Sequence, residues 1–314
     1  MSTEGGLRAV VAALLANLGI AVSKFIAFAF TGSSSLLTEA IHSVADSGNQ
    51  VLLLIGNKRS KKGADAHHNF GYGRRRFIYG FIVAVVLFLV GGMFSLYEGL
   101  HKIQHPEELR DAWIAFLVLG VAIILEAMSF RTALREANKS KGRRSLVRFL
   151  KDSRQPELPV ILLEDAGALL GLCFALCGVS LAVVTGNGVW DGVGALCVGA
   201  LLVVIAIFLA MEMAAMLVGE TALPEEVEAI QAALEASNGV LRVIHLRTLH
   251  VGPDELLVAA KIAVAHSDTG ASIAADINAA EASLRRAVPS ARYVFLEPDI
   301  DHSSGMGDEI LPST

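Results

Sequence analysis

Long apolar runs separated by short polar connections fill the first two thirds of the chain. The runs lie near residues 8–30, 35–57, 76–100, 111–134, 158–184 and 190–218. A helix needs roughly 20 apolar residues to cross the hydrocarbon core of a bilayer, and in lipid only helices and closed barrels satisfy their own backbone. Runs of this length predict an all-α transmembrane domain of six spanning helices.

The basic residues indicate how these helices are oriented. Lys and Arg are concentrated in the connections 58–76 and 139–154, whereas the connections 31–35, 102–110 and 185–188 contain few. Loops rich in Lys and Arg face the cytoplasm. Because the helices alternate in direction, both termini are predicted to be cytoplasmic.

After Leu223 the pattern becomes that of a water-soluble domain. Pro, Glu and Glu open a helix at 224–236, and alternating apolar and polar positions follow around a turn at Gly252-Pro253. The predicted elements are helices at 224–236 and 272–287 and strands at 241–250, 255–264 and 292–297. The order αββαβ predicts a small ferredoxin-like α/β domain. We therefore expect a transmembrane domain at 1–219, a cytoplasmic domain at 220–300 and a disordered tail at 301–314.

Composition supports a membrane protein and argues against other classes. Apolar residues make up 54% of the 314 positions, charged residues 18%, and the mean hydropathy is +0.55. Acidic residues are concentrated after Leu223 while the connections between spans are basic, so the net charge of −5 hides an asymmetry of sign. Nucleic acid is not an expected partner. Cys173, Cys177 and Cys197 lie in apolar runs and are expected to be small packed core residues, although the four-residue spacing of the first two leaves a soft-metal site open.

Ionisable side chains interrupt two of the predicted spans. Glu39, His42 and Asp46 share one face of the second span, which Asn49 extends by a turn, and the acidic pair 164–165 interrupts the fifth. Because ionisable groups are costly in lipid, they are expected to face a polar pathway. Imidazole with carboxylates suits a divalent ion such as zinc, and protons compete with metal for these groups.

Some of these residues also have an interpretation that does not involve a metal ligand. His42 alone is compatible with a hydrogen bond between helices, and Asp46 with an ion pair to a nearby base. Glu39 lies close to the outer end of its span, where it lines a vestibule. Glu126 is interpreted as an interfacial or helix-packing residue, with lining of the pathway as the alternative. The metal interpretation depends on these groups occurring together.

The residues at 35–50 and 68–74 resemble the cation diffusion facilitator family, and the segment 153–166 looks like its zinc transporter 9-like branch. The resemblance extends from Ala9 to Pro298. It implies a homodimer in which each protomer has a metal site between the second and fifth spans, alternating access, and exchange of metal against protons. In the family the second span offers His or Asp four residues before an Asp, which His42 and Asp46 match.

The fifth span departs from the family pattern of His-x-x-x-Asp. Asp165 matches the Asp, but Ile161 occupies the His position and cannot ligate a metal. Glu164 is the obvious substitute, yet adjacent helical residues point roughly 100° apart. The fourth ligand is therefore left open between Glu164, Glu39 and water.

The family's other sites are also only partly matched. In the loop after the second span, Asp65 and His68 match an acid and a histidine, while Tyr72 replaces the second histidine, so weak or no binding is expected. The resemblance also implies a charge interlock between Arg74 and Glu220.

In the C-terminal domain, the family's ligand positions contain Ile244, Ala260 and Glu297. The cytoplasmic metal site is therefore expected to be absent, which leaves this domain a dimerisation module.

These observations favour a proton-coupled efflux transporter of a divalent transition-metal ion, with zinc as the first choice. No enzyme activity and no resident cofactor are expected, only the transported ion and H⁺. The expected location is a bacterial inner membrane. Two alternatives remain: a manganese, iron or cobalt exporter of the same fold, and a non-transporting regulatory protein of the membrane.

Overall fold

A computed structural model describes residues 3–106, 111–141, 145–154 and 157–300, with the side chains of 3–16 and of 140 excepted. The chain divides into two compact units, one up to Leu217 and one from Val218 onward, and each is described by itself. The first unit is helical and the second contains a three-stranded sheet.

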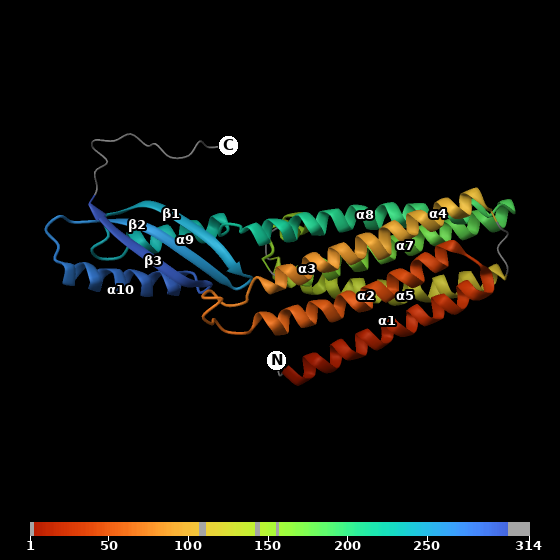
Figure 1. Ribbon diagram of the computed structural model, residues 1–314, viewed down its shortest axis with the longest axis horizontal. Helices are drawn as coiled ribbons and strands as arrows, with labels where there is room; N and C mark the ends of the chain where they lie inside the picture. Colours follow the sequence, from red (N-terminus) through yellow and green to blue (C-terminus); the bar gives the residue numbers. More distant parts are fainter. Residues whose placement is uncertain (1–2, 107–110, 142–144, 155–156, 301–314) are drawn as a thin grey trace. The chain divides into compact units, whose positions relative to one another are not determined.

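Long helices lie side by side in the first unit (Figure 1). They are α1 (Thr3–Thr31), α2 (Ser34–Ser60), α3 (Arg75–Val86) with its continuation to Gln104, α5 (Ala112–Ser140), α7 (Glu157–Thr185) and α8 (Val189–Val218). This confirms the predicted fold class.

Four helices of the described chain are long and apolar enough to cross a membrane by length and composition. They span Arg75–Gln104, Ala112–Lys139, Glu157–Thr185 and Val189–Val218. The helix α2 has the length, but its Glu, His, Asp, Asn and Gln side chains lower its hydropathy. The described apolar part of α1, Asn17–Thr31, is shorter. The polar side chains that α2 carries into the bundle are thus the reason that this helix falls short.

The start of α2 is fixed by polar contacts from another helix. Ser33 accepts a hydrogen bond from the backbone N–H of Leu36, as a helix cap does. Asp191 of α8, fully buried, accepts from the backbone N–H of Ser34 at 2.7 Å and from the Ser33 hydroxyl at 2.8 Å. The helix dipole also favours a carboxylate at a helix N-terminus. Asp191 of α8 therefore helps to set where α2 begins.

The sequence predicted a uniform α-helix for the third span, but the structure differs. Between α3 and α4 (Phe94–Gln104) lies a π-helical segment, η1 (Leu87–Met93). Small residues allow a close approach to α8 here: a Cβ added at Gly92 would lie 2.6 Å from Val203 Cγ2, and one at Gly199 would lie 2.7 Å from the backbone nitrogen of Leu96. Hydrophobic periodicity cannot distinguish π from α over a single turn.

The basic connection between the fourth and fifth spans contains a short helix that the sequence did not predict, α6 (Leu146–Asp152). Ser145 caps it by accepting from the N–H of Arg148. Phe149 is buried against Ala133, Ala137 and Leu162. One apolar anchor in seven residues is too little for a helical pattern to be recognised.

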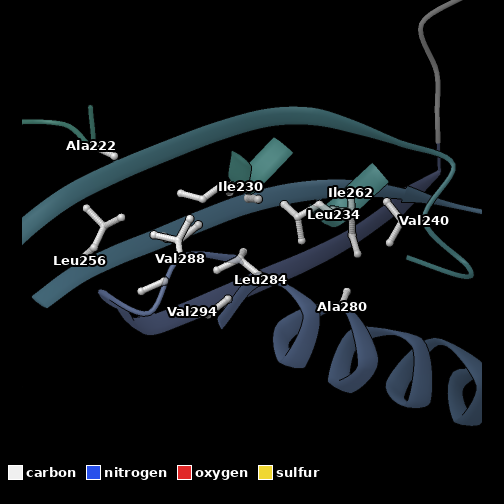
Figure 2. Packing of buried hydrophobic residues seen from close by; sticks show 13 residues of the cluster. Ala222, Ile230, Leu234, Val240, Leu256, Ile262, Ala280, Leu284, Val288 and Val294 are labelled. Atoms are coloured by element: carbon white, nitrogen blue, oxygen red, sulfur yellow. The ribbon is translucent and has the colours of Figure 1, made fainter. Parts of the chain in front are cut away.

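The second unit has the predicted order αββαβ. Its elements are α9 (Pro224–Glu235), β1 (Arg242–Gly252), β2 (Glu255–Val264), α10 (Gly270–Ala287) and β3 (Ala291–Ile300). The sheet order is β1-β2-β3, with β1 antiparallel to β2 and β2 parallel to β3. Figure 2 shows the core, in which Ile230 and Leu234 of α9 and Leu284 of α10 pack with Leu256 and Val294 of the sheet.

Two further expectations concern the three cysteines and the C-terminal tail. Cys173, Cys177 and Cys197 were expected in the packed core, but all three are exposed on the surface of the helical unit. That expectation is wrong because a spanning helix has apolar residues on its outer face as well, so an apolar run does not imply burial. The tail at 301–314, predicted to be disordered, lies outside the described residues.

Candidate metal transport site

His42 and Asp46 are buried together on α2. The His42 Nε2 atom lies 3.3 Å from Asp46 Oδ2, across one helical turn. Neither ring nitrogen of His42 has a hydrogen-bond partner among the described residues, nor does Asp46 Oδ1. Buried polar atoms are nearly always hydrogen-bonded, so unsatisfied ones call for an explanation such as a bound ion or water.

The acidic pair of α7 approaches two neighbouring helices. Glu164 accepts a hydrogen bond from Asn49 Nδ2 of α2 at 2.7 Å. Asp165 accepts one from the Ser129 hydroxyl of α5 at 2.8 Å. The 100° between adjacent helical residues thus directs one carboxylate toward α2 and the other toward α5.

Both carboxylates nevertheless line the same small polar cavity. Its lining comes from α1, α2, α5 and α7, and consists of Asn17, Ile20, Ser43, Asp46, Gln50, Glu126, Glu164 and Asp165. Four of these eight side chains are carboxylic acids. Glu126, which was interpreted as an interfacial or packing residue, belongs to this lining.

The side chains as they stand do not form a finished coordination shell. Among the described residues, no three His, Cys, Asp or Glu side chains are grouped closely enough to hold a metal ion. The structure therefore brings His42 and Asp46 into contact and places Asp46, Glu164 and Asp165 around one cavity. Binding of an ion by three or four of them requires changes of side-chain conformation or small helix movements.

Glu39 has a different environment from the other predicted ligands. Its carboxylate Oε2 lies 3.1 Å from Nζ of Lys24 on α1, and both side chains are fully buried. Sequence reasoning missed Lys24. The available signal was a single lysine inside the first apolar run, which is costly in lipid without a partner.

Of the loop candidates, His68 is exposed and Asp65 is half-buried, and both are engaged in contacts within the loop. Asp65 accepts hydrogen bonds from Lys62 Nζ at 2.9 Å and from the Tyr72 hydroxyl at 2.7 Å. The Lys62 hydrogen bond, followed by that of Tyr72, holds the pKa of Asp65 well below its usual range. His68 Nδ1 lies 3.4 Å from the same carboxylate. A lysine ammonium thus already neutralises the acid that a loop metal would need.

The remaining predicted positions are not part of the cavity lining. Glu297 pairs with Lys261 at 3.1 Å, and the bonds of Lys261 to Asp299 and then to Glu297 raise the pKa of this lysine. Arg74 precedes α3 in the first unit and Glu220 lies in the second, so the interlock between them stays a prediction.

These features define a class: a helical membrane protein with a carboxylate-lined polar cavity between its spanning helices. The cation efflux transmembrane domain matches residues 10–218, so the chain belongs to the cation efflux family, as the resemblance to cation diffusion facilitators predicted.

Known relatives agree with this family. The chain is 35% identical over 225 residues to the mouse (Mus musculus) "Proton-coupled zinc antiporter SLC30A9, mitochondrial", a match that covers 71% of this chain and 39% of the relative. It is 27% identical over 257 residues to "Metal tolerance protein C4" of Arabidopsis thaliana, covering 81% of this chain and 56% of that protein.

"Magnetosome protein MamB" of Magnetospira sp. is 26% identical over 294 residues, covering 92% of this chain and 89% of that protein. Among solved structures, a C-terminal domain of MamM matches with a TM-score of 0.24 and 22% identity, over 24% of this chain and 96% of that one. The chain spans about two fifths of the length of the first of these relatives.

Proposed function

We propose that this protein is a proton-coupled efflux transporter of a divalent transition-metal ion, with zinc as its preferred cargo. The transport site consists of His42 and Asp46 on α2 with Glu164 and Asp165 on α7. Access to it alternates between the two sides of the membrane. The observation that carries this proposal is the cavity lined by Asp46, Glu164 and Asp165 beside an unsatisfied buried His42.

The composition of the site supports zinc or a similar ion and coupling to protons. Imidazole nitrogen with carboxylate oxygens suits a borderline divalent ion, whereas oxygen ligands alone favour Mg²⁺ or Ca²⁺. A ligating histidine must be neutral and a ligating carboxylate ionised, so metal binding releases protons and protonation releases metal. A proton gradient then drives the ion out, with H⁺ as counter-ion.

The proposed arrangement in the cell follows from the basic connections. The Ser60 end of α2 is followed by Lys61 and Lys62 and faces the cytoplasm, and both termini lie on that side of a bacterial inner membrane. The protein acts as a homodimer, joined in part by its second unit and by the interlock of Arg74 with Glu220.

Uptake of zinc into proteoliposomes under an imposed pH gradient tests the proposal. The variant Asp165→Asn keeps the size and the Ser129 contact of the side chain but removes a charge, and it is expected to lose gradient-driven uptake. The matched control is Asp152→Asn, an acid of the surface helix α6 with an exposed partner, Arg148, which is expected to keep it. Equal uptake by all three proteins contradicts the site assignment.

The same assay distinguishes the proposed zinc transport from the two alternative functions. Uptake of manganese, iron or cobalt in place of zinc would change the cargo but keep the mechanism. No flux of any of these ions would favour a non-transporting regulatory protein of the same family.

A further inference from the structure

Lys24 is a fully buried cation in the middle of the described part of α1. Its ammonium donates to the Ser43 hydroxyl at 2.8 Å, to Glu39 Oε2 at 3.1 Å and to the backbone carbonyl of Glu39 at 3.5 Å. All three acceptors belong to α2. A lysine ammonium has three hydrogens to donate, so its hydrogen-bonding capacity is used up within these two helices.

The carboxylate of Glu39 continues this contact to a third helix. A Cβ added at Gly171 of α7 would lie 2.6 Å from Glu39 Oε1. Only a glycine leaves the space that this oxygen needs. Lys24 of α1, Glu39 of α2 and the backbone of α7 at Gly171 therefore meet at one level of the bundle.

This level lies at one end of the cavity, where Ser43 both lines the cavity and accepts from Lys24. Glu39 precedes Asp46 by seven residues on α2, and Gly171 follows Glu164 by seven on α7, which places the ion pair about 10 Å along the helices from the acids. The cavity-lining residues of α1, Asn17 and Ile20, are likewise displaced from Lys24 toward the Ser60 end of α2. The ion pair thus lies on the Ser34 side of the cavity.

We propose that the Lys24–Glu39 ion pair is the barrier that closes the transport pathway on the Ser34 side, and that Lys24 keeps Glu39 out of the metal-binding shell. The lysine acts as a tethered counter-cation, because it neutralises a carboxylate that would otherwise attract the transported ion. It does so through Glu39 Oε2 alone, since Oε1 has no hydrogen-bond partner among the described residues. This inference rests on the proposed function and adds a positioning role to two residues outside the cavity.

The physical argument is the cost of separating buried charges. Removing one partner of a buried pair leaves an uncompensated charge, which is strongly destabilising, while replacing both by neutral groups of similar size is often tolerated. The barrier therefore stays closed until another conformation offers both groups water or new partners. Movement of α1 relative to α2 provides such a conformation.

Thiol accessibility tests the barrier without measuring transport. Gln50, which lines the cavity, is replaced by cysteine in a background where the three native cysteines are serine. The purified protein is reconstituted and labelled from either side with a membrane-impermeant maleimide. Labelling from the Ser34 side is expected to be at least about tenfold slower than labelling from the other side. This ratio corresponds to a conformation open to the Ser34 side that is populated about tenfold less than the one open to the other side.

The double variant Lys24→Met with Glu39→Gln removes both charges and keeps the side-chain volumes, and it is expected to abolish this difference. The single variant Lys24→Met is expected to fold poorly, because it leaves Glu39 as an unpaired buried charge.

The exchange Lys24→Glu with Glu39→Lys is expected to restore slow labelling, because it re-forms the ion pair. The matched control Ser23→Ala alters an exposed neighbour on α1 and is expected to leave the difference unchanged. Unchanged asymmetry in the double variant overturns the proposal.

Zinc binding to the detergent-solubilised variants tests the second half of the inference. Glu39→Gln, with Lys24→Met, is expected to bind zinc within about threefold of the unaltered protein, whereas Asp46→Asn is expected to lose at least about tenfold. A loss with the Glu39 variant as large as that with Asp46→Asn would make Glu39 a ligand and overturn the assignment. If the unaltered protein carries no metal in the liposome assay but keeps its labelling asymmetry, the proposed function fails while the barrier stands.

Discussion

Gly171 of α7 is packed so closely that a larger side chain is expected to destabilise the fold. Because an added Cβ would lie 2.6 Å from Glu39 Oε1, Gly171→Ala forces the carboxylate or α7 to shift. We expect a loss of about 1–3 kcal/mol of unfolding free energy, as for overpacked cores. Thermal unfolding in detergent measures it. The matched control is Gly48→Ala on α2, where no atom lies within 4 Å of the added Cβ; a similar loss there would contradict the packing argument.

The loop acid Asp65 gives a prediction for pH. Hydrogen bonds from Lys62 and then from Tyr72 lower the pKa of Asp65 in the folded protein. The ion pair therefore stabilises the fold fully above the unfolded-state pKa of about 3.9. This stabilisation is lost progressively as the pH falls below that value. We expect Asp65→Asn to melt at a lower temperature than the unaltered protein at pH 7 and 5. The difference should shrink at pH 3. A difference independent of pH would show that charge is not its origin.

Sequence reasoning predicted most of the candidate site because ionisable groups are conspicuous within apolar runs. His42 and Asp46 are one turn apart, and this spacing alone predicts their contact. Lys24 was missed because it is the sole charged group inside its apolar run after Arg8, without a periodic partner on α1. Ser129 was missed for another reason: a serine in a span has no distinctive pattern until the helix that it faces is known.

At the scale of elements, the strands and helices of the second unit were predictable to within a few residues. Proline, glycine and alternating apolar positions mark their ends and faces. The π-helical segment and α6 were not predictable, because the first depends on packing of Gly92 against α8 and the second on one buried phenylalanine. The order of strands in the sheet also required the structure, since the crossover through α10 determines that β3 pairs with β2.

Packing of α9 and α10 on the sheet gives a prediction for the second unit. Ile230 and Leu284 are fully buried in its core, whereas Leu241 is 64% exposed. We expect Ile230→Ala or Leu284→Ala to cost about 2–5 kcal/mol of unfolding free energy, and the control Leu241→Ala to cost little. Denaturant unfolding of the full chain, followed by protection of the sheet amides from hydrogen exchange, measures the difference. Equal effects at buried and exposed positions would contradict this core assignment.

For the whole molecule, the division into two compact units predicts that the helical unit keeps its fold without the other. The first unit has apolar clusters of its own, for example around Leu202 of α8 and Leu172 of α7, and the core of the second unit is separate. A chain ending at Leu217 is therefore expected to keep the circular dichroism signal of its helices. Loss of that signal would mean that the second unit is needed for folding.

The same truncation tests the proposed dimerisation role of the second unit. If that unit supplies most of the dimer contacts, the chain ending at Leu217 should be monomeric at protein concentrations where the full chain is dimeric, as measured by light scattering with correction for detergent. A second unit destabilised by Leu284→Ala is expected to weaken the dimer less than its complete removal. A truncated chain that remains fully dimeric would place the dimer contacts on the lipid-facing surfaces of the helices, where Cys173, Cys177 and Cys197 are exposed.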